Sequence, residues 1–111
     1  MARSSVPTTL HLHVPTRPTQ AIETIAYFSV AELLANVAKH SHARHATVGV
    51  AAQHQLLRIE VTDDGTGGAV AGAGSGLTGL GDLVRAVDGR LRVSSPEGGP
   101  TVVTVSLPLH A

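Results

Sequence analysis

The sequence predicts an α+β domain: a two-layer sandwich whose mixed sheet of about five strands carries its helices on one face. Two segments repeat apolar side chains at the helical period, and five shorter ones alternate apolar and polar residues at the strand period. Their order along the chain is strand, helix, strand, strand, helix, strand, strand, which is typical of such a sandwich. No repeat or linker divides the chain, so we expect residues 1–111 to form a single domain, with residues 1–9 as a flexible tail.

Composition narrows the classes of function. The chain has no cysteine, so disulfides and thiolate metal sites are excluded. Eight Lys and Arg balance eight Asp and Glu, so we expect no nucleic-acid partner and no direct membrane contact. No apolar run approaches a transmembrane span, and the first residues lack the apolar core of a signal peptide, so we expect a soluble, cytoplasmic domain.

The first half of the fold is predicted from three segments. Residues 10–14 form an edge strand with three inward side chains, Leu10, Leu12 and Val14. After Pro15 and Pro18, Thr19 caps a long helix that covers residues 21–40 and ends near Ser41. Residues 46–52 and 56–63 then form an antiparallel hairpin around the polar connection 53–55.

The second half begins with a loop, residues 64–76. A second helix over residues 77–87 carries one apolar face, made of Leu80, Leu83, Val84 and Val87. Gly89 stands at its C-terminal stop. Residues 90–95 and 101–107 form a final hairpin, joined by a segment rich in proline and glycine.

The long helix has a polar edge beside its apolar face. Glu32, Asn36 and Lys39 are spaced by four and three residues, so all three point the same way. Because this edge borders the buried face, it can line a cleft. The alternative is a solvated stripe at the boundary of the core.

Two polar residues are aimed at the inner face of the sheet. Asp63 shares its strand face with Leu57, Ile59 and Val61, and Thr101 shares the face of the last strand's apolar residues. A buried carboxylate requires hydrogen-bond donors, so Asp63 can receive a ligand N–H group. The alternative is a carboxylate that caps the following turn.

Glycine is concentrated between residues 65 and 81, where eight glycines predict a mobile lid that approaches a ligand closely. The segment ends in Gly-Ser-Gly-Leu-Thr-Gly, residues 74–79, directly before the second helix. Free N–H groups at a helix start suit a phosphate. A flexible linker is the alternative reading.

Other motifs receive less support. Residues 74–79 match the dinucleotide-binding glycine pattern, but ten residues separate them from the preceding strand instead of none. A phosphate loop of the Walker type is excluded because the only lysine, Lys39, lies on the first helix. His40, His42 and His45 cluster without an adjacent carboxylate, which disfavours a zinc site. No nucleophile elbow supports a Ser/His/Asp triad.

Four motifs in order resemble the histidine-kinase-like ATPase superfamily, the Bergerat fold. Residues 32–40 (ELLANVAKH) look like its N box, residues 63–68 (DDGTGG) like its first glycine box, and residues 74–91 like its second. Residues 98–109 are similar to its last hairpin. The Lys-His pair, the short lid and the start of the second helix are most similar to sensor kinases of the nitrate-sensor subclass.

The resemblance implies a Mg²⁺–ATP site and assigns its residues. Asn36 would coordinate Mg²⁺, and Glu32 would be the catalytic acidic residue. Asp63 would accept the adenine amino group, with Thr101 completing that network through water. The remaining positions would contact or enclose the phosphates: Lys39, His40, Gly65, Gly67, Gly74, Gly76 and Leu77.

The implied function is the ATP-binding catalytic domain of a two-component histidine kinase, which transfers the γ-phosphate to a histidine on a separate dimerisation domain and serves a response regulator indirectly. No segment resembles the phospho-accepting histidine box, so we expect an excised or stand-alone catalytic domain of a parent that can be membrane-anchored. Three positions depart from the family pattern: Gly68, Asp88 and Pro100. Two alternatives are a stand-alone anti-sigma-factor-type serine kinase and a non-catalytic nucleotide-binding interaction module.

Overall fold

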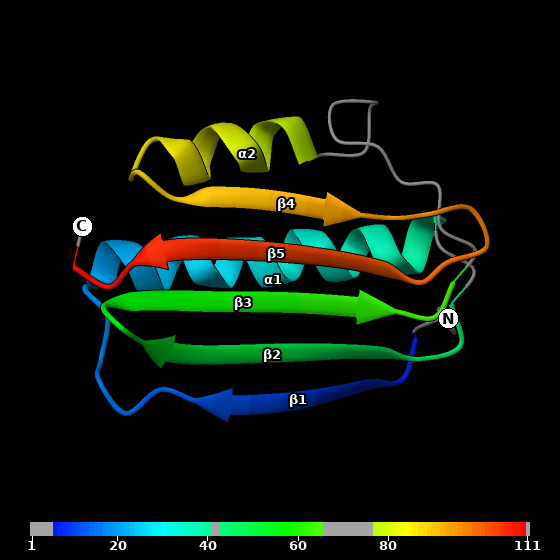
Figure 1. The fold of residues 1–111 in the computed structure, drawn as a ribbon, viewed down its shortest axis with the longest axis horizontal. Helices are drawn as coiled ribbons and strands as arrows, with labels where there is room; N and C mark the ends of the chain where they lie inside the picture. Colours follow the sequence, from blue (N-terminus) through cyan, green and yellow to red (C-terminus); the bar gives the residue numbers. More distant parts are fainter. Residues whose placement is uncertain (1–5, 41–42, 66–76, 111) are drawn as a thin grey trace, which may run out of the picture.

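The computed structural model describes residues 6–40, 43–65 and 77–110, which form two layers (Figure 1). The elements are β1 (Thr8–His13), α1 (Gln20–His40), β2 (Ala46–Gln53), β3 (Leu56–Asp63), α2 (Leu77–Arg85), β4 (Arg90–Ser94) and β5 (Thr101–Pro108). The sheet order is β1-β2-β3-β5-β4, with β1 parallel to β2 and the other neighbours antiparallel. The predicted mixed five-stranded sheet with helices on one face is therefore confirmed.

The core lies between the sheet and the two helices. Every second residue of β3 and β5 is buried, because successive side chains of a strand point to opposite faces. These residues meet the apolar arcs of the helices in one cluster, which includes Ile22, Leu33, Val37, Ile59, Val61, Leu80, Val84, Val105 and Leu107. Neither of the two described helices covers the opposite face of the sheet.

Helix α1 begins where the sequence predicts. The Ile22 N–H group donates to Thr19 Oγ1 at 3.4 Å, and the Glu23 N–H group donates to the Thr19 carbonyl at 2.9 Å, so Thr19 is the N-cap. Residues 20–39 are long and apolar enough to cross a membrane by length and composition, so the expectation that no segment reaches this level was wrong. In this fold the apolar arc of α1 packs on β3 and β5 as a core helix.

The edge strand β1 is less buried than the sequence predicts. Leu10 pairs with Val48 and Leu12 with Val50, so both point to the side of the sheet that carries the helices. They are nevertheless 57% and 65% exposed, and Val14 lies beyond the end of the strand. The reason is that α1 packs on β3 and β5, two strands away. β1 also begins at Thr8, inside the expected tail.

The β2–β3 hairpin has a two-residue turn. Gln53 pairs with Leu56, which leaves only His54 and Gln55 in the connection, at φ values of 54° and 66°. Two consecutive residues at positive φ are the requirement of a type I′ turn, whose twist matches that of the flanking strands.

The end of α2 differs in detail from the prediction. The Gly89 N–H group donates to the Val84 carbonyl at 2.9 Å and the Asp88 N–H group to the Arg85 carbonyl at 3.0 Å, which is a Schellman motif. Its left-handed position is Asp88, at φ 62°, and Gly89 follows it. Leu83, expected on the apolar face, is 39% exposed.

Gly89 is required by packing instead. A Cβ atom there would lie 2.6 Å from the Ser106 carbonyl oxygen and 2.8 Å from Val84 Cγ1. The chain leaving α2 therefore passes directly over β5.

Candidate functional site

The described residues of the predicted site lie at one end of the sandwich. Figure 1 shows that the C-terminal ends of α1 and β3 lie at the same end as the beginnings of α2 and β5. Helix α1 also packs directly against β3 and β5. Four parts of the fold thus lie around a common region. They are the polar edge of α1, the end of β3 with Asp63, the start of β5 with Thr101 and the start of α2 with Leu77.

Asp63 is a buried carboxylate, 4% exposed, on the inner face of the sheet, as predicted. Its Oδ1 accepts the Gly65 N–H group at 2.8 Å, so the turn that follows β3 supplies one donor. Burial raises the pKa of Asp63 above its ordinary value, the Gly65 hydrogen bond lowers it in part, and the charge of Asp64 raises it further. Asp63 therefore does cap the turn that follows β3, as the alternative interpretation predicted. Because a carboxylate has two oxygens that together accept several hydrogen bonds, Asp63 can still accept one from a ligand.

Thr101 lies directly beside Asp63. The two residues are paired in the β3–β5 register, and Thr101 is 7% exposed. Its Oγ1 lies 2.6 Å from Ser95 Oγ, so the hydroxyl of Ser95 extends the polar group of Asp63 and Thr101. Sequence reasoning placed Ser95 in the last hairpin without a role, although strand alternation puts it on the inner face.

Asn36 brings a buried amide from α1. The residue is half-buried, and its Nδ2 is the buried side-chain nitrogen or oxygen that lacks a hydrogen-bond partner among the described residues. Such groups are uncommon in folded proteins and are expected to have an unseen partner, either an ion, a ligand or water. An amide oxygen is also a ligand that Mg²⁺ accepts, and amide orientation is assigned from surrounding partners, so Asn36 fits a metal or phosphate site.

The other residues of the α1 edge are more open. Glu32 is half-buried and Lys39 is exposed, as expected for groups at the mouth of a cleft. Gly65 and Leu77 are both buried where the glycine-rich segment leaves β3 and enters α2. Four further predicted contacts lie outside the described residues or side chains: His40, Gly67, Gly74 and Gly76.

Asp64 has a structural role that sequence reasoning missed. Its Oδ1 accepts the Arg44 N–H group at 2.8 Å and the His45 N–H group at 3.0 Å. These hydrogen bonds lower the pKa of Asp64, with the His45 bond contributing most. Because residues 44 and 45 follow α1, Asp64 ties the connection after the Asn36 helix to the end of the strand that carries Asp63.

The histidine cluster does not form a described metal site. His45 Nε2 lies 3.0 Å from Thr9 Oγ1, and the described residues contain no group of three or more His, Cys, Asp or Glu side chains able to hold a metal ion. His42 and the His40 side chain lie outside that part of the structure.

Comparisons with known proteins identify the family of this chain. The family described as histidine kinase-, DNA gyrase B-, and HSP90-like ATPase matches residues 22–111. Sensor histidine kinase YvfT from Bacillus subtilis (strain 168) is 34% identical over 79 residues, which are 70% of this chain and 21% of that protein. The chain thus spans about a fifth of the length of this curated relative.

Solved structures show the same fold. The Erythrobacter litoralis EL346 blue-light activated histidine kinase matches with a TM-score of 0.74 and 21% identity, over 96% of this chain and 36% of that chain. Acinetobacter baumannii histidine kinase AdeS matches with a TM-score of 0.67 and 18% identity, over 94% of this chain and 55% of that chain.

The family match and the curated relative define one class of protein, the ATP-binding catalytic domain of sensor histidine kinases, and the solved structures share its fold. The chain belongs to the histidine kinase-, DNA gyrase B-, and HSP90-like ATPase family, whose match begins in α1 and runs through β5.

Proposed function

We propose that this domain binds Mg²⁺–ATP and presents the γ-phosphate to a histidine on the separate dimerisation domain of a parent kinase, which passes the phosphoryl group to a response regulator. The observation that carries the proposal is the placement of Asp63 and Thr101 at the same end of the sandwich as Asn36, whose buried Nδ2 has no hydrogen-bond partner among the described residues. The half-buried Glu32 on the same helix supports the assignment of catalysis to that region.

Adenine binding rests on Asp63. As a carboxylate, Asp63 is an acceptor only, which suits the amino group of adenine. Gly65 already donates to Oδ1, which fixes the orientation of the carboxylate before a base arrives. Thr101 has a hydroxyl that donates and accepts, so it can complete the network through water. The absence of an aromatic partner in the core makes this polar recognition the main source of base specificity.

The metal would be held by Asn36, with most of its remaining ligands supplied by phosphate oxygens and water, as is usual for Mg²⁺. When bound, the ion neutralises phosphate charge. This chain's own part is to hold the amide in place, which the core contacts of the adjacent Leu33 and Val37 accomplish on the same helix.

Glu32 would orient or deprotonate the acceptor histidine, and Lys39 would neutralise phosphate charge from the end of α1. Phosphoryl transfer depends mainly on positioning and charge stabilisation, so neither residue acts alone. His40, Gly67, Gly74 and Gly76 remain predicted phosphate contacts from the family resemblance.

A cytoplasmic location belongs to the same proposal, because ATP and response regulators are cytoplasmic. The relative named a sensor histidine kinase is about five times longer than the matched part, which leaves room for a membrane anchor in a parent chain.

The proposal is tested by adding γ-labelled ATP, this domain and a separately produced dimerisation domain that carries an acceptor histidine. We expect labelling of that domain that is lost in acid, because phosphohistidine is acid-labile. Glu32→Gln should keep ATP affinity within about twofold and slow the transfer by about 100-fold or more, the usual contribution of a general base. Glu23→Gln, on the same helix but paired with Arg17, is the matched control and should transfer normally.

Three results would contradict the proposal. An acid-stable product would instead indicate a serine kinase. ATP binding without transfer to any acceptor domain would indicate an interaction module. Transfer by Glu32→Gln at the normal rate would remove the catalytic role from Glu32.

A further inference from the structure

The face of the sheet opposite to α1 and α2, called the outer face below, carries three arginines. Alternation along the strands places Arg58 of β3, and Arg90 and Arg92 of β4, on this outer face, because their neighbours Leu57 and Leu91 point to the helix side. The register sets Arg58 and Arg90 on either side of Ser106 in β5, and it sets Arg92 beside Thr104. Three guanidinium groups therefore surround two hydroxyl groups.

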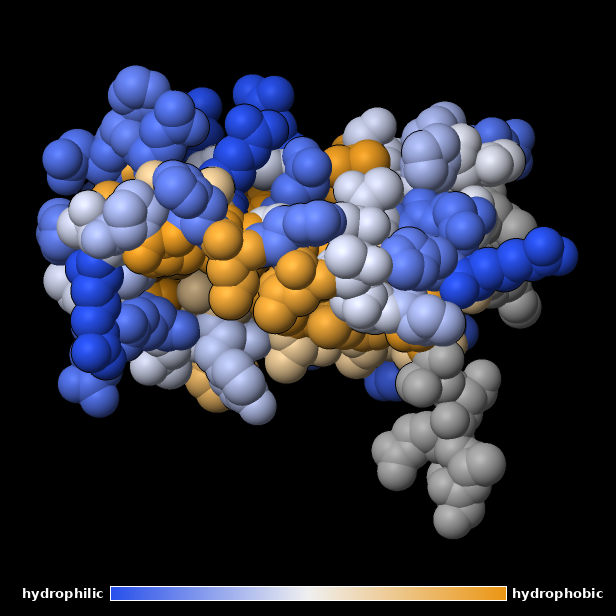
Figure 2. Space-filling view, turned by 90° about the horizontal axis from the view of Figure 1, so that it is seen from below, coloured by the Kyte–Doolittle hydropathy of each residue, from blue (hydrophilic) through white to orange (hydrophobic). Residues whose placement is uncertain are grey.

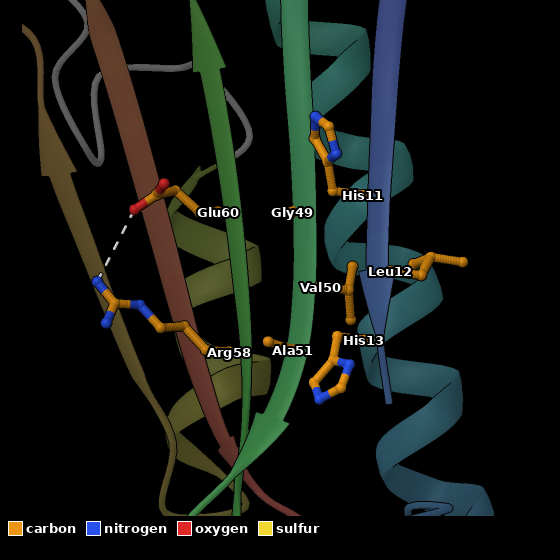
Figure 3. Close-up of a pocket in the computed structure, with 8 residues that line it drawn as sticks. All are labelled: His11, Leu12, His13, Gly49, Val50, Ala51, Arg58 and Glu60. Atoms are coloured by element: carbon orange, nitrogen blue, oxygen red, sulfur yellow. Dashed lines mark ion pairs between the residues drawn. The ribbon is translucent and has the colours of Figure 1, made fainter. Parts of the chain in front are cut away.

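These side chains line a hollow of about 240 Å³, formed by Arg58, Arg90, Arg92, Thr104 and Ser106. Figure 3 shows the Arg58 side chain extended from β3 across β5 toward β4. Because adjacent strands lie about 4.8 Å apart, the backbones that carry Arg58 and Arg90 are separated by about 10 Å. Two long arginine side chains can therefore reach one anionic group held over Ser106.

Positive charge dominates this face although the chain as a whole has no net charge. Eight Lys and Arg balance eight Asp and Glu over the sequence. In the five strands, Glu60 is the one acidic residue at an outer-facing position, and its Oε2 lies 3.8 Å from Arg58 Nη2 (Figure 3). Both side chains are well exposed, so this pair is weak and can exchange for a partner's carboxylate.

The hollow continues toward β1. A second hollow of about 300 Å³ is bordered by His11 and His13 on one side and by Arg58 and Glu60 on the other (Figure 3). Gly49 has no side chain to fill this hollow, and a Cβ atom at that position would meet nothing within 4 Å. Arg58 lines both hollows, so they lie next to each other across the sheet, and we call the two together the trough. Four strand spacings give it a length of about 19 Å, enough for several extended residues.

We propose that this trough is a docking site for an extended acidic segment of a protein partner, whose carboxylates pair with Arg58, Arg90 and Arg92. Arginine binds carboxylates through two parallel hydrogen bonds, and Thr104 and Ser106 offer hydroxyls to the segment's backbone. The proposal does not depend on nucleotide binding, since the trough lies on the opposite face of the sheet from Asp63 and Asn36.

The same observations disfavour other anionic polymers. The only tyrosine and phenylalanine of the chain, Tyr27 and Phe28, lie on α1, so the trough offers bases neither of these rings to stack on. Anionic membranes are recognised by clusters of about four to eight basic residues beside a membrane anchor, whereas the described strands place three arginines and one carboxylate on this face.

Fluorescence anisotropy with a labelled peptide of alternating Glu and Ser tests the proposal. We expect this peptide to bind, its Gln–Ser counterpart not to bind, and affinity to fall several-fold between about 50 and about 200 mM salt. The triple variant Arg58→Gln, Arg90→Gln, Arg92→Gln should bind about tenfold more weakly, because three exposed ion pairs are lost. The matched control, Arg17→Gln, Arg44→Gln, Arg85→Gln, removes three exposed arginines outside the trough and should bind within about twofold of the unmodified domain.

A charge-reversed triple variant, with glutamate at positions 58, 90 and 92, should lose the acidic peptide and bind a Lys–Ser peptide instead. Equal binding of the Glu–Ser and Gln–Ser peptides would overturn the proposal. An equal loss of peptide affinity in the triple variant of the trough and in the control triple variant would also overturn it. Binding of a DNA duplex or of phosphatidylglycerol vesicles through the three arginines, without binding of the acidic peptide, would also overturn it and assign the trough to that partner.

Discussion

Replacing Asp63 with asparagine removes one charge and changes almost no volume. Asparagine keeps an oxygen that can accept the Gly65 N–H group, so the turn after β3 should persist. Its NH₂ group, however, would face the donor amino group of adenine. A hydrogen bond to a charged acceptor contributes about 1.5–3 kcal/mol, so we expect Asp63→Asn to weaken ATP binding by about 10- to 150-fold.

Isothermal titration calorimetry with Mg²⁺–ATP measures this directly. The matched control is Glu60→Gln, which removes a carboxylate from the same strand on the opposite face and should change affinity by less than about twofold. Unchanged ATP affinity of Asp63→Asn would refute the assignment of adenine recognition to this carboxylate. An equal loss in both variants would show that only the overall charge matters.

The stability of Asp63→Asn separates lost recognition from lost folding. Burial raises the pKa of Asp63 in the folded chain, so the folded state binds more protons than the unfolded state, and unliganded stability falls as pH rises from about 3.8 through that raised pKa. Asparagine carries no such penalty. We therefore expect Asp63→Asn to be at least as stable as the unmodified domain at pH 7, and its relative advantage to shrink toward pH 4, in urea unfolding at the two pH values. A less stable variant at pH 7 would contradict the pKa argument.

Three further predictions concern the frame around the site, each measured by urea unfolding. Gly89→Ala should destabilise the domain by about 1–3 kcal/mol, because its Cβ would press on the Ser106 carbonyl and Val84; an unchanged midpoint would contradict the close approach. Asp88→Gly should stabilise it by about 0.5–1 kcal/mol by relieving a left-handed residue, and a loss of stability would show that the aspartate side chain compensates. Asp64→Asn should be less stable at neutral pH, with the difference disappearing as pH falls below about 3.8, because hydrogen bonds lower the folded-state pKa of Asp64; a difference that persists at low pH would indicate another cause.

The alternation of apolar and polar residues in the strands predicted the positions of the site residues best. A period of two decides which face each side chain takes, so the inward positions of Asp63 and Thr101 followed from their apolar neighbours. Their direct pairing did not follow from alternation, because it depends on β3 and β5 being neighbours in the sheet.

Sequence reasoning missed the features that depend on how distant segments pack together. Leu10 and Leu12 have the right alternation, but their exposure depends on where α1 crosses the sheet, which periodicity does not determine. The bonds of Asp64 to residues 44 and 45 join segments about 20 residues apart, and the closeness of Ser95 to Thr101 depends on the turn between them.

The outer-face trough was also beyond sequence reasoning. Arg58 is separated by more than 30 residues from Arg90 and Arg92, and nothing local in the sequence indicates that β5 lies between them. The balanced net charge of the chain led only to the prediction of no nucleic-acid partner and no direct membrane contact, and it gave no sign of this arginine-rich face. The net charge of a whole chain does not show how charges are distributed, and here the order of the strands brings three arginines together on one face.

The central claim is that one nucleotide lies between Asp63 on the sheet and Asn36 on α1, and paramagnetic broadening of amide NMR signals by Mn²⁺–ATP tests it most directly. Mn²⁺ replaces Mg²⁺ at oxygen-rich sites, so the account predicts strong broadening around Asn36, while Gly65 and Thr101 shift with the base and Gly49 on the outer face stays unchanged. Broadening that spares α1, or that centres on the outer face, would contradict it.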